Sequence, residues 1–70
     1  MKIYVKHRKA LQRLRVMQGY TQKAFAKKVG ISNVRLCDIE NKPQQKVSVS
    51  TANNIINALN CEWSDIFELE

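Results

Sequence analysis

The sequence contains few of the residues that interrupt helices. Only two glycines and one proline occur among its 70 residues, whereas Ala, Leu, Gln, Lys and Arg are plentiful. A turn-rich β fold needs more Gly and Pro than this, so the composition favours helices. With 44% apolar residues we expect one compact domain, although a chain this short buries only about 60% of its unfolded surface.

Long apolar runs are also missing. No segment approaches the length of a membrane-spanning helix, and the start, MKIYVKHRK, has no apolar stretch long enough for a signal peptide. We therefore expect a cytoplasmic protein with no membrane partner.

Cysteine and histidine are too scarce for a metal centre. Cys37 and Cys61 are the only cysteines, and no CxxC motif or pair of histidines accompanies them. A structural zinc site needs four ligands, so we expect no metal and two reduced thiols. His7 stands alone, and the sequence contains no paired acid and base, no nucleophile constellation and no phosphate-binding loop. We therefore expect no enzymatic activity, no cofactor and no small-molecule ligand.

Acidic residues are absent from the first half of the chain. Residues 1–34 contain nine Lys or Arg and no Asp or Glu, whereas residues 35–70 contain three basic and six acidic residues. The nine are Lys2, Lys6, Arg8, Lys9, Arg13, Arg15, Lys23, Lys27 and Lys28. One basic half of this kind predicts a surface that faces a polyanion, most often nucleic acid.

Apolar residues recur at helical spacing in five segments, so we expect an all-α fold. The segments are Lys6 to Gln18, Thr21 to Val29, Ser32 to Asn41, Ser48 or Ser50 to Leu59, and Trp63 to Glu68. The first has an inward stripe made of Ala10, Leu11, Leu14 and Met17. Its arginines fall off this stripe, toward water or a partner. The last short turn would fold Trp63, Ile66 and Phe67 over the bundle as a lid.

Helix boundaries are marked by capping residues. Thr21 and Ser32 can each accept a backbone N–H at a helix N-terminus. Gly30 can take the left-handed conformation after the second helix, and Pro43 forbids continuation of the third. Residues 1–5 alternate enough for a short strand, but an N-terminal arm with a frayed end is favoured. The expected domain therefore covers residues 6–70, preceded by this arm.

Residues 22–41 fit two helices that cross at a short turn. Ala26 is small enough for close approach of the helices, and Gly30 supplies the turn. Leu36 and Ile39 would be buried. The outward face of the third helix then carries Val34, Cys37, Asp38 and Asn41, with Ser32 and Asn33 at its N-terminal end.

Three stretches of the chain resemble the helix-turn-helix domains of the lambda-repressor and Cro type. They are LQRLRVMQGYTQKAFAKKVGIS, LCDIEN and IINALNCEWSDIF. The resemblance implies a compact five-helix bundle in which the second and third helices form the helix-turn-helix motif. It also implies a sequence-specific regulator that usually binds double-stranded DNA as a dimer, with its third helix in the major groove.

The resemblance also assigns roles to individual residues. Phosphate contacts fall to Arg15, Thr21, Gln22 and Asn41, and base contacts fall to Asn33, Val34 and Asp38. Further residues expected at the interface are Lys23, Ser32, Arg35, Cys37, Lys42 and Lys46. The chain departs from the family at Lys42-Pro43, where glycine is frequent, and its next loop is about one residue longer. This departure blurs the roles of Lys42 and Lys46.

Several of these residues have alternative interpretations. Asn33 could pair with adenine through its amide or be only a polar residue of the first turn. Val34 could contact a thymine methyl group or be exposed incidentally. Asp38 could accept from cytosine N4, reject wrong bases, or pair with Arg35. Cys37 could touch a base or only fill space.

We therefore expect a DNA-binding transcriptional regulator, a repressor of the phage or mobile-element type that associates with the nucleoid. Useful specificity calls for two copies on the operator. A homodimer would use the C-terminal part, with Trp63, Phe67 and Leu69, or the N-terminal arm. The alternative is an antitoxin or protein-interaction module, in which the same bundle mainly binds a partner protein.

Overall fold

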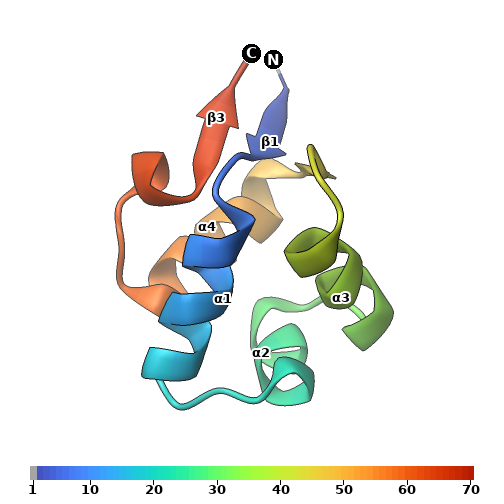
Figure 1. The fold of residues 1–70 in the computed structure, drawn as a ribbon, viewed down its shortest axis with the longest axis vertical. Helices are drawn as coiled ribbons and strands as arrows, with labels where there is room; N and C mark the ends of the chain where they lie inside the picture. The colour runs from blue at the N-terminus through green and yellow to red at the C-terminus, as the bar shows by residue number, and fades with distance from the viewer. Residues whose placement is uncertain (1) are drawn as a thin grey trace.

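The computed structural model of the protein describes residues 2–70, which form four α-helices, one 3-10 turn and three short strands. Met1, part of the expected N-terminal arm, lies outside the described residues. The helices are α1 (Arg8–Met17), α2 (Gln22–Val29), α3 (Asn33–Asn41) and α4 (Val49–Leu59). The strands are β1 (Ile3–Val5), β2 (Lys46–Val47) and β3 (Phe67–Leu69), and the 3-10 turn η1 covers Trp63–Asp65. In Figure 1, α3 lies to one side, α1 lies in front of α4, and the two termini lie together at one end.

The helices α2, α3 and α4 begin and end close to where the sequence predicts. The hydroxyls of Thr21, Ser32 and Ser48 each accept a backbone N–H at a helix N-terminus. Such a cap stabilises a helix by about 1 kcal/mol. Gly30 ends α2 at φ 80°, and Asn60 ends α4 at φ 54°. The first helix starts two residues later than expected, because the backbone N–H groups of Lys6 and His7 donate to the carbonyl of Ile66.

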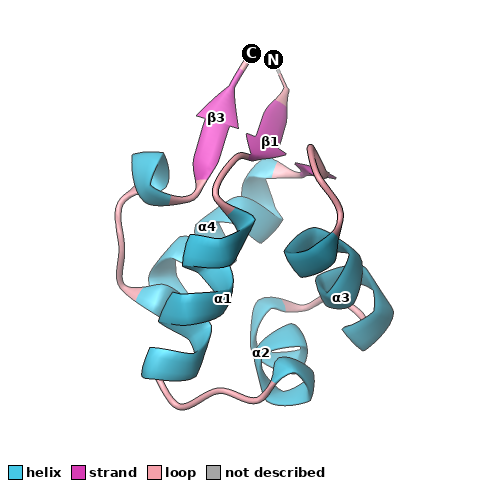
Figure 2. Ribbon diagram, in the orientation of Figure 1, coloured by secondary structure: helices cyan, strands magenta, loops and turns pink. Residues whose placement is uncertain are grey.

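A small antiparallel sheet corrects the expectation of an all-α fold. Its strand order is β2-β1-β3, and Figure 2 shows the strands gathered at the end of the molecule away from α2. In the central strand, Tyr4 lies opposite both Lys46 and Glu68. Residues 3–5 are therefore part of the domain. The expectation of an N-terminal arm is wrong for them.

The expected fifth helix is also corrected. Only Trp63–Asp65 is helical, as a 3-10 turn, and Phe67–Leu69 is extended. An isolated helix of six residues is unstable in water, because it forms too few hydrogen bonds to offset the free-energy cost of nucleation. Pairing with β1 instead satisfies the backbone: Lys2 and Glu70 exchange two backbone hydrogen bonds of 2.7 and 2.8 Å. The lid itself is present, since Ile66 and Phe67 are buried and Trp63 packs against Phe67.

The core is one cluster to which all four helices, β1 and β3 contribute. Its buried apolar residues are Ile3, Val5, Leu11, Phe25, Ala26, Val29, Leu36, Ile39, Ala52, Ile55, Leu59, Ile66 and Phe67. One detail differs from the sequence prediction: on α1, Met17 is 72% exposed whereas Arg15 is buried. No helix in residues 2–70 combines the length and the apolar character needed to span a bilayer.

Candidate nucleic-acid interface

The candidate interface consists of the first turn of α2 and the outward side of α3. Thr21 and Ser32 precede these helices and are both exposed, each with its hydroxyl oxygen accepting a backbone N–H, from Ala24 at 3.1 Å and from Arg35 at 3.0 Å. The remaining N–H groups of both first turns are available to an anion, and the helix dipole favours negative charge there. Lys23 is exposed beside the first of these termini. Two helix ends can therefore contact phosphate.

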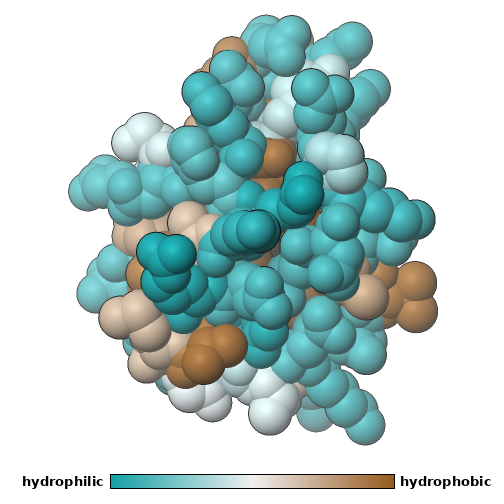
Figure 3. All heavy atoms as spheres, in the orientation of Figure 1, coloured by the Kyte–Doolittle hydropathy of each residue, from teal (hydrophilic) through white to brown (hydrophobic). Residues whose placement is uncertain are grey.

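The outward side of α3 carries mostly polar, exposed side chains. Asn33 is exposed in the first turn, and Val34 next to it is 72% exposed. Cys37 and Asn41 lie further along the same side, and the amide nitrogen of Asn41 donates to the Cys37 carbonyl at 2.8 Å. Figure 3 shows an apolar protrusion at its right edge, over α3. This surface resembles a reading helix: its N-terminal residues project freely, while Leu36 on the opposite side is fully buried.

A buried ion pair holds α3 against α1. The Nε of Arg15 donates to Glu40 at 2.7 Å and its Nη2 donates to the other carboxylate oxygen at 3.2 Å. The Nη1 donates to the backbone carbonyl of Tyr20 at 2.9 Å. Both side chains are at least nine-tenths buried. This arrangement argues against the expected phosphate contact of Arg15, because a guanidinium that turned outward would leave a buried carboxylate without its cation.

Gln22 joins this network from α2. Its amide nitrogen lies 3.4 Å from Glu40 Oε1, at the limit of a hydrogen bond. The side chain is half-buried, so one of its faces contacts the pair and the other faces solvent. Three helices thus share one carboxylate. The arrangement orients Gln22 at the edge of the candidate interface.

Arg35 is used inside the molecule. Its guanidinium donates to Gln45 Oε1 at 2.7 Å and to the backbone carbonyl of Lys46. The carbonyl of Gln45 in turn accepts the N–H of Val5 at 2.9 Å. Arg35 therefore fixes the loop after α3 and connects it to the sheet. These contacts argue against the expected DNA contact of Arg35, because extension toward DNA would break both hydrogen bonds.

Pairing with Arg35 was one of the alternatives for Asp38, and the structure does not show it. Its carboxylate lies 3.4 Å from the Nζ of Lys42, one turn further along. Lys42 is exposed, and Asp38 is half-buried. The negative charge of Asp38 on the reading side is therefore partly compensated by a neighbouring cation. Lys46 is also exposed, at the start of β2.

The two thiols lie in different environments. Cys37 is exposed on α3. Cys61 is half-buried after α4, where burial raises the pKa of its thiol and the carboxylates of Asp65 and Glu62 raise it further. A raised pKa keeps the Cys61 thiol protonated and poorly nucleophilic at neutral pH. No group of three or more His, Cys, Asp or Glu side chains in residues 2–70 is arranged to hold a metal ion.

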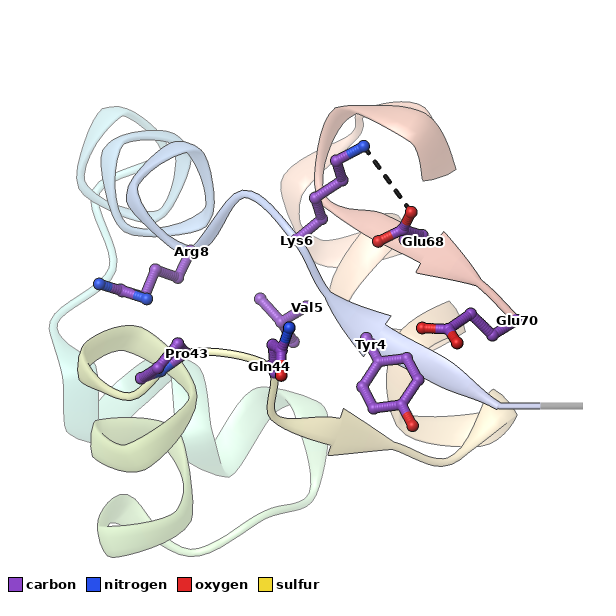
Figure 4. A pocket seen from close by; sticks show the side chains of 8 residues that line it. All are labelled: Tyr4, Val5, Lys6, Arg8, Pro43, Gln44, Glu68 and Glu70. Carbon is purple, nitrogen blue, oxygen red and sulfur yellow. Dashed lines mark ion pairs between the residues drawn. The ribbon is translucent and has the colours of Figure 1, made fainter.

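A hollow of about 530 Å³ lies beside this interface, between β1, β3 and the loop after α3 (Figure 4). Lys6 and Arg8 contribute positive charge to its wall, and Glu68 and Glu70 contribute negative charge. Lys6 and Glu68 form an ion pair of 3.8 Å across it. This mixture of charges does not match a polyanion, so the hollow lies outside the candidate interface.

Sequence reasoning missed Glu40 and Gln45. Glu40 lies four residues after Leu36 and directly after Ile39. Arg15 has the same spacing from two leucines, four residues after Leu11 and directly after Leu14. Each charged residue thus occupies an inward position of its helix, and their opposite signs could have identified the pair. Gln45 has no comparable signal, because it lies in an irregular loop.

Comparison with known proteins identifies a matching family. The helix-turn-helix family model matches residues 11–66, from the fourth residue of α1 to the residue before β3. The match includes all of α2, α3 and α4. A search of the curated proteins finds none that matches the chain.

Proposed function

The chain belongs to the lambda-repressor-like helix-turn-helix family of DNA-binding regulators, and from this membership we propose that it reads operator half-sites as a homodimer. The observation that carries this proposal is the two-sided construction of α3. Leu36, Ile39 and Glu40 are buried on one side, whereas Asn33 and Val34 project into solvent on the other. We propose a repressor role, in which the bound protein blocks a promoter that overlaps its operator.

Phosphate contacts would set the position of the protein on the duplex. The donors are the helix N-termini after Thr21 and Ser32, together with Gln22, Lys23 and the exposed Lys42. These contacts supply affinity with little sequence information. The exposed Lys46 and Asn41 extend the phosphate-facing surface beyond α3.

Base reading would come from the first turns of α3. Asn33 can donate to N7 and accept from N6 of adenine, and Val34 can contact a thymine methyl group. Asp38 lies one turn further along, where it can accept from cytosine N4 once Lys42 turns to a phosphate. Since Arg35, the one arginine of α3, is used internally, we propose specificity with few charged base contacts.

The second copy would join through the end of the molecule that contains the sheet. Glu70 exchanges backbone hydrogen bonds with Lys2, so the backbone groups of Leu69 face away from β1, along a free sheet edge. The Leu69 side chain is 53% exposed there. The molecule is 30 Å long, with the sheet at one end (Figure 1). The centres of two copies joined at this end would lie about one molecular length apart. This distance is close to the roughly 34 Å between half-sites one DNA turn apart.

Selection from a pool of randomised duplexes tests the proposal. We expect enrichment of a two-fold-symmetric site with half-sites about 10 base pairs apart. The selection is repeated at several salt concentrations. Equal binding to all duplexes, lost steeply as salt rises, would reduce the interaction to non-specific electrostatics.

Two substitutions separate base reading from phosphate binding on the selected site. Asn33→Ala is expected to relax preference at one base pair by about 1–3 kcal/mol. Gln22→Ala is expected to weaken all sites about equally, because a phosphate contact carries no base information. Asn57→Ala, an exposed asparagine on α4, is the matched control and leaves binding unchanged. A reversed pattern for Asn33 and Gln22 would show that the assignment is wrong.

A further inference from the structure

The outward side of α1 lies outside the proposed DNA interface. Its residues line a shallow groove of about 410 Å³: Lys9, Gln12, Arg13, Val16 and Met17. Val16 is 61% exposed and Met17 is 72% exposed. Figure 3 shows apolar residues at the lower left, over the C-terminal end of α1, below a hydrophilic area. Two large apolar side chains on consecutive exposed positions of one helix mark an unpartnered face.

The charges on this face are of one sign. Lys9 and Arg13 lie one helical turn apart, and α1 contains no acidic residue. The ion pairs among residues 2–70 involve Lys6, Arg15 and Lys42, and neither Lys9 nor Arg13. Like charges at this spacing destabilise a helix slightly. A bound carboxylate between them would remove that repulsion.

The position of Arg15 shows why this face is separate from the DNA interface. Arg15 points from α1 toward α3, where it binds Glu40. At 100° per residue, Val16 lies about 100° and Arg13 about 160° around the helix from Arg15. The groove therefore faces away from the α1–α3 contact. The apolar pair Val16 and Met17 is also a poor match for a phosphate backbone.

A second copy of α1 is a poor occupant as well. In a two-fold contact the same patch meets itself, so the cations Lys9 and Arg13 of both copies would lie close together. Charge complementarity calls instead for a partner with carboxylates. The apolar pair calls for an apolar side chain beside them.

We infer that this face of α1 docks an acidic amphipathic segment of a partner protein. Two carboxylates about one helical turn apart lie over Lys9 and Arg13, and an apolar side chain packs between Val16 and Met17. The apolar contact provides affinity, and the charges fix orientation and exclude basic segments. This surface does not depend on the proposed operator binding, so either can fail alone.

A designed peptide tests the inference. It is helical, with two glutamates one turn apart followed by two leucines on the same face, and it is titrated into isotopically labelled protein while amide chemical shifts are followed. We expect saturable shifts at Lys9, Gln12, Arg13, Val16 and Met17, and none in α3. A peptide of the same composition in scrambled order is expected to bind at least about tenfold more weakly, equivalent to about 1.4 kcal/mol.

Charge exchange is the matched control. The double variant Lys9→Glu/Arg13→Glu is expected to lose the acidic peptide and to bind the version with lysines in place of glutamates. The double variant Val16→Ser/Met17→Ser is expected to weaken the acidic peptide about tenfold while leaving duplex binding unchanged. Both pairs are surface substitutions, and thermal melting confirms that each variant is folded.

Three outcomes would overturn the inference. Equal binding of ordered and scrambled peptides would show unspecific charge attraction. Shifts at α1 with vesicles of anionic lipid, and none with the peptide, would assign the face to a membrane surface. Chemical-shift changes at Val16 and Met17 on addition of duplex DNA would assign the face to the nucleic-acid interface.

Discussion

The helical region, α1 to α3, and the sheet are each crossed by one ion pair between residues distant in sequence, and the two pairs differ in burial. Arg15 and Glu40 are 9% and 1% exposed, whereas Lys6 and Glu68 are 53% and 48% exposed. In the helical region a polar contact sets the position of the reading helix. In the sheet, backbone hydrogen bonds set the positions of the strands, and the ion pair adds little to them. The structural weight of an ion pair therefore depends on where the fold places it.

Breaking each pair by one substitution gives the largest expected contrast. Arg15→Met leaves the buried carboxylate of Glu40 without its cation and is expected to lower the free energy of unfolding by about 3–5 kcal/mol. Lys6→Met breaks the exposed pair and is expected to cost about 0–1 kcal/mol. Urea denaturation of both variants measures the difference. Equal losses would show that the two regions are held together in the same way.

A second variant keeps this prediction informative if Arg15→Met does not fold. Arg15→Met/Glu40→Leu replaces the whole pair with apolar side chains and is expected to recover most of the stability. The duplex affinity of this double variant is also expected to depend on salt concentration as that of the unmodified protein does. A salt slope smaller by about one unit would restore Arg15 as a phosphate contact.

The same contrast explains what the sequence could predict. Thr21, Gly30 and Ser32 act within three or four residues of themselves, so the helix boundaries of the helical region follow from local chemistry. The strands are two or three residues long, and their partners lie more than forty residues away in the chain. Ile66 and Phe67 fit a helix or a strand equally well by spacing alone. Only the pairing with β1 decides between them.

Removing a buried side chain from the central strand tests whether the sheet belongs to the core. Ile3 is 5% exposed, and Ile3→Ala is expected to lower the free energy of unfolding by about 2–3 kcal/mol, the lower end for such a truncation. Tyr4→Ala, on the other face of β1, is the control and is expected to cost less. Denaturation midpoints with unchanged slopes measure both. A loss below about 0.5 kcal/mol for Ile3, typical of a surface substitution, would mean that the helices are stable without the sheet.

Two positions with positive φ, one in each region, are expected to respond with opposite sign. Gly30 has φ 80°, and a Cβ there would meet no atom within 4 Å, so Gly30→Ala acts through the backbone alone and is expected to cost about 1–2 kcal/mol. Gln44, in the loop that leads to β2, has φ 54° without being glycine. Gln44→Gly is expected to stabilise by up to about 1 kcal/mol, since relief of the left-handed strain is partly offset by the entropy of glycine.

Thermal unfolding of the Gly30→Ala and Gln44→Gly variants measures these changes. Gly30→Asn is the matched control, because asparagine tolerates the left-handed region better than alanine. A neutral Gly30→Ala would mean that the turn between α2 and α3 can change conformation. A destabilising Gln44→Gly would mean that the Gln44 side chain contributes more than its backbone strain costs.

The smallest expected effect concerns Asp38 and Lys42, a partly exposed pair in the helical region that is comparable to the Lys6–Glu68 pair beside the sheet. A double-mutant cycle with Asp38→Ala and Lys42→Ala is expected to give a coupling of only about 0.3–0.5 kcal/mol. Because so little holds the pair, DNA can separate it at little cost, with Lys42 moving to a phosphate and Asp38 to a base. The same cycle, measured on duplex affinity, is then expected to show Lys42→Ala weakening all sites and Asp38→Ala changing the preferred base. If Asp38→Ala instead strengthens binding to every duplex equally, Asp38 acts only by repelling phosphate, and the reading surface of α3 is confined to its first turn.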